Sequence, residues 1–359
     1  MPLAADITAW LRLSLTSGLG GEPFRKLLSS FGGPEQVLGA SRSALTRVVS
    51  GKVADAILDG EMFGDPAAVE AWLADTNNHV VTLADTEYPQ ALLQTPDPPP
   101  LIYVKGRLEL LNHAAMAIVG SRNATAQGKL TAESFAMALS NAGLCVISGM
   151  ALGIDAAAHR GGLAGVSSTL AVVGTGLDKV YPARNRDLAH AIAEKGALIS
   201  EFPLGTPPLA ANFPRRNRLI SGMTRGCLVV EAAMSSGSLI TARLSNELGK
   251  DVFAIPGSIH STLSKGCHVL IKQGAKLVDD AADILGELRL PVPAGGPSQT
   301  AAAAPDHPLL AHLGFDPCDM DTLAGRAGLP VHEISATLLQ LELDGVVASL
   351  PAGLWQRIS

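Results

Sequence analysis

Seven short apolar runs between residues 115 and 279 constrain the fold more than any other feature of this sequence. Each is rich in Val, Ile, Leu or Ala, and stretches long enough to hold a helix separate most of them. Strands that are apolar along their whole length belong to a parallel sheet covered by helices on both faces. We therefore predict an α/β fold with a doubly wound, mostly parallel sheet of the extended Rossmann-like type. The predicted strands are residues 115–120, 144–149, 169–174, 197–202, 227–232, 251–256 and 276–279.

The first 75 residues follow a helical pattern instead. Leucines at helical spacing in residues 9–21, 23–31 and 52–58 indicate short helices separated by Gly-rich turns. The turn SGLGG at 17–21 faintly resembles that of a helix-hairpin-helix, whose amides contact a DNA phosphate. A plain packing or partner-binding module is favoured over DNA binding for this part of the chain. We predict a small helical domain over residues 1–75.

The C-terminal part follows a Pro-, Gly-, Ser- and Ala-rich stretch that has the composition of a linker, predicted at 291–305. Residues 306–359 then have the order of a winged helix, with three helices before a short hairpin. The third predicted helix contains Glu333 and Glu342 and no Lys or Arg, so phosphate would repel it. A role in protein contact is favoured over the reading of duplex DNA.

Other sequence features indicate the cellular location of the protein. The start of the chain has no basic region typical of a secretory signal, and no apolar run reaches the ~18 residues of a membrane span. Cys145, Cys227, Cys267 and Cys318 are isolated in sequence, which favours buried reduced thiols. We expect a cytoplasmic protein with no membrane partner.

Signatures of catalysis and of cofactor binding are missing. The sequence has no P-loop motif, and GTGLDK at 174–179 lacks the third glycine of a dinucleotide fingerprint. Asp155 and His159 share a helical face, where a structural hydrogen-bonding role is favoured over acid–base chemistry. His260 and His268 have no metal-ligand spacing with a Cys or carboxylate. We expect no cofactor, no metal and no catalytic residue.

A concentrated positive patch stands out on an acidic chain. The formal net charge is −6, yet residues 114–288 carry 16 Lys and Arg against 13 Asp and Glu. Four arginines lie in FPRRNRLISGMTRG at 213–226, and no acid occurs within 202–230. We therefore predict an anion-binding surface with no local carboxylate to neutralise it. Phe213, at its start, either stacks on a base or belongs to the core.

Polar, Gly-rich loops follow the predicted strands. GSRNATAQG at 120–128 offers a hydroxyl and a guanidinium, and the helix that follows should begin with a free anion site. MSSGSLIT at 234–241 is rich in hydroxyls. The carboxyl ends of parallel strands meet at one edge of the sheet, so these loops should form one surface that follows successive phosphates. The alternatives are purely steric glycines and a pairing of Arg122 with Glu231.

Several motifs in this order resemble the DNA-processing protein A family (DprA/Smf): IVGSRNATAQG, VISGMALGIDAAAH, FPRRNRLISGMTRG and SSGSLITA. The resemblance covers residues 79–290 and implies a Rossmann-like DNA-binding domain there. It also implies a sterile-alpha-motif-like or hairpin-helix N-terminal extension and a winged-helix-like tail. Members of the family bind and protect single-stranded DNA and load the RecA recombinase onto it during natural transformation, displacing single-strand-binding protein. They act as homodimers through the Rossmann-like domain, without known catalysis.

The chain departs from the family at two positions. Ala183 and Ala210 stand where many relatives have lysines, and we expect Arg184 and Arg215 to supply the charge instead. A charge reversal at Arg218 is expected to abolish binding and leave the fold intact. The residues predicted to contact DNA are Gly120, Ser121, Arg122, Lys179, Arg184, Phe213, Arg215, Arg216, Asn217, Arg218, Gly237, Ser238, Thr241, Lys265 and Gly266.

Two other functions compete with this interpretation. A nucleotide-processing hydrolase of the lysine-decarboxylase-like group would use the same edge of the sheet, with Glu231 as its acid. Its P-G-G-x-G-T-x-x-E motif is absent, and residues 231–241 read EAAMSSGSLIT. A regulator of duplex DNA acting through the tail is the second alternative.

Overall fold

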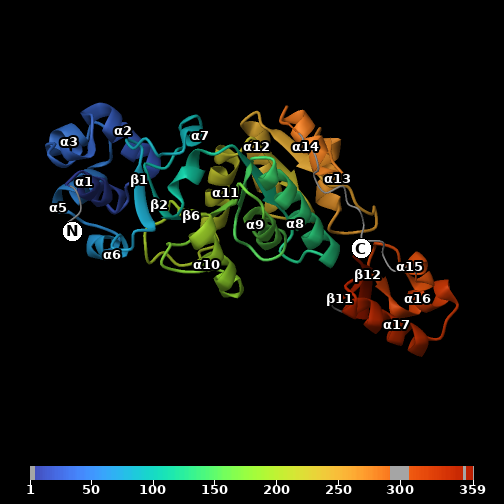
Figure 1. The fold of residues 1–359 in the computed structure, drawn as a ribbon. Helices are drawn as coiled ribbons and strands as arrows, with labels where there is room; N and C mark the ends of the chain where they lie inside the picture. Colours follow the sequence, from blue (N-terminus) through green and yellow to red (C-terminus); the bar gives the residue numbers. More distant parts are fainter. Residues whose placement is uncertain (1–4, 292–306, 351–352, 359) are drawn as a thin grey trace.

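A nine-stranded sheet forms the centre of the computed structural model, which describes residues 5–291, 307–350 and 353–358. Its strand order is β1-β2-β6-β5-β4-β3-β7-β8-β9, and every pairing from β6 to β9 is parallel. The predicted mostly parallel α/β fold is confirmed (Figure 1). The seven predicted strands correspond to β3 (Ala115–Val119), β4 (Cys145–Ser148), β5 (Thr169–Val172), β6 (Ala197–Ser200), β7 (Gly226–Val229), β8 (Asp251–Ala254) and β9 (Lys276–Leu277).

Two antiparallel strands that were not predicted extend the sheet beyond β6. They are β1 (Asn78–Thr82) and β2 (Leu101–Gly106), and β2 pairs with β6. The apolar run of β2 follows directly on the proline-rich residues 95–100, and such a composition is typical of a break between elements rather than of the approach to a strand.

Helices cover both faces of the sheet because successive side chains of each strand alternate in direction. In β3, Met116 and Ile118 pack with one set of helices, and Ala117 and Val119 pack with the other. The first face holds α8 (Ala126–Asn141), α9 (Ile154–Ala164), α10 (Arg186–Lys195) and α14 (Ala281–Glu287). The second holds α7 (Gln90–Leu93), α11 (Asn212–Met223), α12 (Ser238–Glu247) and α13 (Lys265–Lys272).

Short helices make up the N-terminal part, as predicted. Their core includes Trp10 and Phe24, whose rings stack with centroids 5.7 Å apart. The same apolar cluster contains Leu101 and Tyr103 of β2, so these helices pack on the antiparallel end of the sheet (Figure 1). They are α1 (Ala5–Ser14), α2 (Gly21–Phe31), α3 (Pro34–Leu38), α4 (Arg42–Leu45), α5 (Gly51–Asp59) and α6 (Pro66–Trp72).

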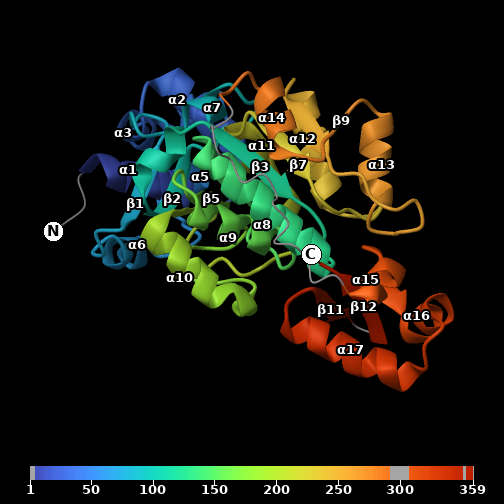
Figure 2. The ribbon, with the colours of Figure 1, turned by 45° about the vertical axis from the view of Figure 1, so that its right-hand side comes forward.

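The C-terminal part has its own core and its own sheet, in the predicted winged-helix order. Leu310, Leu323 and Leu338 lie in this core. Figure 2 shows it beyond α8, away from the N-terminal helices. Residues 292–306, which include nearly all of the predicted linker, lie outside the described residues. The elements are α15 (Pro308–Leu313), β10 (Cys318–Asp319), α16 (Met320–Ala327), α17 (Val331–Leu343), β11 (Val347–Leu350) and β12 (Leu354–Arg357).

The predictions for the cysteines are confirmed, because all four thiols are buried and free. Among the residues that the structure describes, no helix is both long and apolar enough to cross a membrane.

Candidate nucleic-acid interface

A cleft of about 750 Å³ opens at the carboxyl ends of the central strands. The chain runs outward from β3 through β4 and β5 to β6 and then returns to β7 on the other side of β3. The loops that follow β3 and β7 therefore diverge, and such a switch point is where open α/β sheets bind ligands. The predicted contact residues that line the cleft are Gly120, Ser121, Arg122, Phe213, Arg216, Asn217, Gly237, Ser238 and Thr241.

The loop after β3 is held in place by its backbone. The Ser121 amide donates to the Glu231 carbonyl at 2.7 Å, and the Ile154 amide donates to the Ser121 carbonyl at 3.1 Å. Gly153 has a φ of +77°, and a Cβ there would lie 2.2 Å from the Ser121 carbonyl oxygen. Only glycine satisfies both conditions. The start of α9 therefore fixes Ser121 and Arg122 at the cleft.

Arg216 brings a buried positive charge to the cleft. Its side chain, in a residue only 5% exposed, donates to the carbonyl oxygens of Gly149 and Val172, at the ends of β4 and β5. A Cβ at Gly149 would lie 2.3 Å from the guanidinium, so the close approach requires glycine. Burial lowers the pKa of Arg216 to about 10, although Asp155 opposes this shift. The side chain is therefore still protonated at neutral pH.

Aromatic and cationic side chains meet at one wall of the cleft. Phe213 is half-buried, with the guanidinium carbons of Arg122 and Arg216 at 5.8 and 6.0 Å from its ring centroid. The ring of Tyr181 lies 5.6 Å from the same ring and also lines the cleft. Tyr181 was not among the predicted residues, because its position at the cleft depends on packing against Phe213, which lies 32 residues later in the chain.

Glu231 occupies the helix start that was predicted to be a free anion site. Its two carboxylate oxygens accept from the Thr125 amide at 3.0 Å and the Thr125 hydroxyl at 2.6 Å, directly before α8. That prediction was wrong because a carboxylate distant in sequence already satisfies these donors. Glu231 is engaged here and forms no ion pair with Arg122 in the described parts of the chain. The hydroxyl-rich loop before α12 faces the cleft, where the Ser236 and Ser238 hydroxyl oxygens are 2.7 Å apart.

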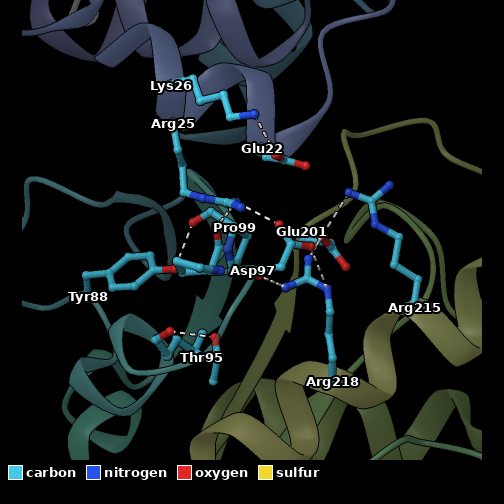
Figure 3. A network of polar contacts seen from close by, with 12 residues as sticks. Glu22, Arg25, Lys26, Tyr88, Thr95, Asp97, Pro99, Glu201, Arg215 and Arg218 are labelled. Carbon is cyan, nitrogen blue, oxygen red and sulfur yellow. Dashed lines mark hydrogen bonds and ion pairs between the residues drawn. The ribbon is translucent and has the colours of Figure 1, made fainter. Parts of the chain in front are cut away.

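Two arginines of the predicted patch turn away from the cleft. Arg215 pairs with the Glu201 carboxylate at 3.1 Å, and Arg218 pairs with the same group (Figure 3). The side chain of Glu201 is only 2% exposed. Burial raises the pKa of this carboxyl, and the two arginines oppose the rise. The prediction that no carboxylate neutralises the patch was wrong, because β6 places Glu201, one residue before the acid-free stretch, beside α11.

The same contacts reach the N-terminal helices. Arg218 lies 3.5 Å from the Asp97 carboxylate, which also accepts from Arg25 of α2 at 2.7 Å. Arg25 donates to the Pro98 carbonyl at 2.7 Å as well. Residues 95–100 therefore join α2 to α11 rather than separate two parts of the chain (Figure 3). We call Arg25, Asp97, Glu201, Arg215 and Arg218 the Glu201 network.

The remaining predicted residues lie outside the cleft lining. Lys179 donates to the Gly205 carbonyl at 2.6 Å, and Lys265 donates to the Ile259 carbonyl. Arg184 is exposed, and Gly266 is buried against Ala232. Arg225, the fourth arginine of the patch, directly precedes β7 and so lies at the opposite edge of the sheet.

The acid–base pair considered from the sequence has the structural role that was favoured. The Asp155 carboxylate accepts from the Gly149 and Ala151 amides, at 3.1 and 3.3 Å. His159 is buried, with its Nδ1 2.7 Å from the Thr169 hydroxyl. Within the described ranges, no group of three or more His, Cys, Asp and Glu side chains could hold a metal ion.

Known proteins resemble the chain over most of its length. The family described as DNA recombination-mediator protein A matches residues 79–289, and the DprA winged helix domain matches 293–353. Protein Smf of Escherichia coli is 44% identical over 79% of this chain and 78% of its own length.

Two solved structures are similar as well. The X-ray structure of DNA processing protein A from Streptococcus pneumoniae has a TM-score of 0.69 at 37% identity, covering 80% of this chain and 99% of that one. The structure of DNA processing protein A from Helicobacter pylori, reported for its single-stranded DNA binding mode, has a TM-score of 0.54 at 29% identity. That match covers 59% of this chain and 96% of the other one. The chain therefore belongs to the DNA-processing protein A (DprA/Smf) family.

Proposed function

We propose that this protein binds and protects single-stranded DNA in the cleft beyond β3 and β7, without strong sequence preference, and loads the RecA recombinase onto it. The observation that carries the proposal is the convergence of Arg122 and Arg216 with two aromatic rings at the switch point of the sheet. Guanidinium groups bind phosphates, and aromatic rings contact bases of any identity.

The contents of the cleft favour contacts with the DNA backbone. Arg122 is exposed and forms no ion pair with a carboxylate of the described residues, so its charge is available to a phosphate. Hydroxyls of Ser235 and Ser236 and the start of α12 provide further donors. These groups do not discriminate between bases, which is why we propose binding that is independent of sequence. We propose that Lys179, Arg184 and Lys265 extend the path of the DNA.

The partners of the protein are proposed from its family. The description of the family as recombination mediators supports RecA as the recombinase that receives the DNA. We propose that a homodimer through the Rossmann-like part performs this step during natural transformation or recombinational repair, in competition with single-strand-binding protein. The protein would act in the cytoplasm without a cofactor.

Fluorescence anisotropy tests the binding. A labelled oligo-dT and the matching duplex would each be titrated with the full chain over a series of salt concentrations. We expect tighter binding of the single strand, with log K falling by ~0.7 per phosphate neutralised for each tenfold rise in salt. Equal affinity for the duplex, or an affinity independent of salt, would contradict the proposal.

A nucleation assay tests the RecA step. The ATPase activity of RecA on DNA coated with single-strand-binding protein would be followed with and without this protein. We expect a shorter lag in its presence, and no shortening by Arg122→Ala, which lacks the exposed cation of the cleft. An unchanged lag with wild-type protein would contradict the proposed loading of RecA but not the proposed binding of single-stranded DNA.

A further inference from the structure

We infer that a groove between the N-terminal helices and the central sheet binds a partner protein, through a segment that carries apolar and cationic side chains. The groove has a volume of about 410 Å³ and shares no lining residue with the cleft. Helix α6 and the loops that follow β5 and β6 contribute to it. We call it the Trp72 groove, and its lining includes Leu15, Asp65, Val69, Trp72, Asp178 and Leu204.

Exposed apolar side chains border the Trp72 groove on two sides. Phe63, directly before the lining residue Gly64, is 64% exposed. Its amide donates to the Leu15 carbonyl, which fixes this part of the chain beside the groove. On the other side, Val180 is 40% exposed and lies two residues after Asp178. Apolar surface around a largely apolar groove is typical of a site that another protein covers.

The charge around the groove favours a cationic partner. Residues 53–104 contain nine Asp and Glu and no Lys or Arg. Asp65 and Asp178 line the groove, and they accept from the amides of Ala67 at 2.9 Å and Gly205 at 2.8 Å. Neither carboxylate forms an ion pair with a Lys or Arg of the described residues. Both negative charges are therefore available to Lys or Arg side chains of a partner.

The same charges argue against other occupants of the groove. Phosphates of DNA would be repelled by this stretch, so the groove is not an extension of the DNA path. An acidic segment of a partner would be repelled in the same way. A segment that places an apolar side chain in the groove and Lys or Arg side chains beside it satisfies both the lining and the carboxylates.

The groove lies next to the cleft along the chain. The loop after β5 contributes Asp178 to the groove and Tyr181 to the cleft. The loop after β6 contributes Leu204 to the groove and Pro208 to the cleft. A partner in the Trp72 groove would therefore lie beside the strand that the proposed function places in the cleft, without covering the same surface.

Anisotropy of labelled synthetic peptides, titrated with the full chain, tests this inference. The first peptide has a Phe–Leu pair flanked by lysines on both sides. The second, of the same length, has glutamates in place of the lysines, and the third has alanines in place of the Phe–Leu pair. We expect the first peptide to bind about ten-fold more tightly than either of the others, because only it offers both apolar burial and opposite charge.

Variants of the lining locate the binding of the lysine-flanked peptide. Ala68→Arg adds a large cation at an exposed lining position of α6 and should abolish measurable binding. Asp65→Asn combined with Asp178→Asn keeps oxygens that accept the backbone amides but removes both charges, so affinity should fall by about 2- to 30-fold. The control is Glu87→Gln, at an exposed acid outside the groove, which should bind as wild type does. Thermal melting would confirm that each variant is folded.

Binding of DNA separates this inference from the proposed function. Ala68→Arg should bind oligo-dT as wild type does, and a loss of that affinity would assign the groove to the DNA path instead. Failure of wild type to prefer the lysine-flanked peptide, or full affinity of Ala68→Arg for it, would overturn the inference. Self-association of the wild-type chain that Ala68→Arg abolishes would show that a second copy occupies the groove, which also contradicts it.

Discussion

Helix α11 (Asn212–Met223) carries two arginine-containing faces with different surroundings. On one side, Phe213 and Arg216 line the cleft, where the arginine donates to backbone carbonyls. On the other side, Arg215 and Arg218 pair with the buried Glu201 carboxylate. Arg216 is therefore placed to contact a phosphate in the cleft, whereas Arg215 and Arg218 are already paired with a carboxylate.

The formal charge of the two regions does not explain this difference. The Glu201 network contains three arginines and two carboxylates, and the cleft contains Arg122 and Arg216 with the single carboxylate of Asp155. Each region therefore has one net positive charge. The carboxylates of the network bind arginines directly, whereas Asp155 accepts from two backbone amides. An anion can use the arginines of the cleft without breaking an ion pair.

Reversing the charge at Arg218 should have the largest effect, and it should act on stability. Arg218→Glu removes the partner of a carboxylate that is 2% exposed and places a second carboxylate beside it. Breaking a buried pair costs ~3–5 kcal/mol, so the free energy of unfolding should fall by about that amount. Urea denaturation measures this change. The matched control is Arg215→Ala, whose more exposed pair with Glu201 should cost about 1 kcal/mol or less.

This expectation replaces the one drawn from the sequence alone, which placed the effect of Arg218→Glu on binding and left the fold intact. A variant with wild-type stability and no affinity for DNA would restore that earlier interpretation. A partial recovery of stability by Glu201→Gln in an Arg218→Gln background would support the pair instead.

Removing the exposed cation of the cleft should have the next largest effect, on binding alone. Arg122→Ala loses a charge-assisted contact worth ~1.5–3 kcal/mol, so affinity for oligo-dT should fall by about 10- to 100-fold. Its melting temperature should stay near that of wild type, because Arg122 is exposed and unpaired with any described carboxylate. Anisotropy and thermal melting measure both quantities. Arg160→Ala, at an exposed arginine paired with Glu133 on the other face of the sheet, is the control and should bind normally.

Cutting the network at its N-terminal end should have the smallest effect. Arg25→Ala removes a partly exposed pair with Asp97 and a hydrogen bond to Pro98, together worth about 1 kcal/mol. We expect faster proteolysis of residues 5–72 and unchanged affinity for oligo-dT. A weaker affinity would show that the position of the N-terminal helices contributes to the DNA path.

The fold and most of the cleft could be predicted from the sequence. Fully apolar strands gave the parallel sheet, and the rule that ligands bind beyond the carboxyl ends of strands located Gly120, Arg122 and Gly237. Strands β1 and β2 were missed because a proline-rich segment separates them.

The partners of individual side chains could not be predicted in the same way. Glu201 pairs with Arg218, which is 17 residues away in sequence. Glu231 accepts a hydrogen bond from Thr125, which is 106 residues away. Whether an arginine or a helix start is free depends on such contacts, which a local window of sequence does not contain. Tyr181 was missed for the same reason, since its position at the cleft depends on packing against Phe213, which lies 32 residues later in the chain.

Hydrogen–deuterium exchange with and without saturating oligo-dT tests most directly whether the cleft is the DNA-binding surface. We expect DNA to slow the exchange of amides in residues 121–125 and 235–241, at the two loops of the switch point. Peptides from α2 and from residues 95–105, on the side of the Glu201 network, should exchange at the same rate in both samples. Slower exchange at α2 and 95–105, with the cleft loops unchanged, would contradict the account.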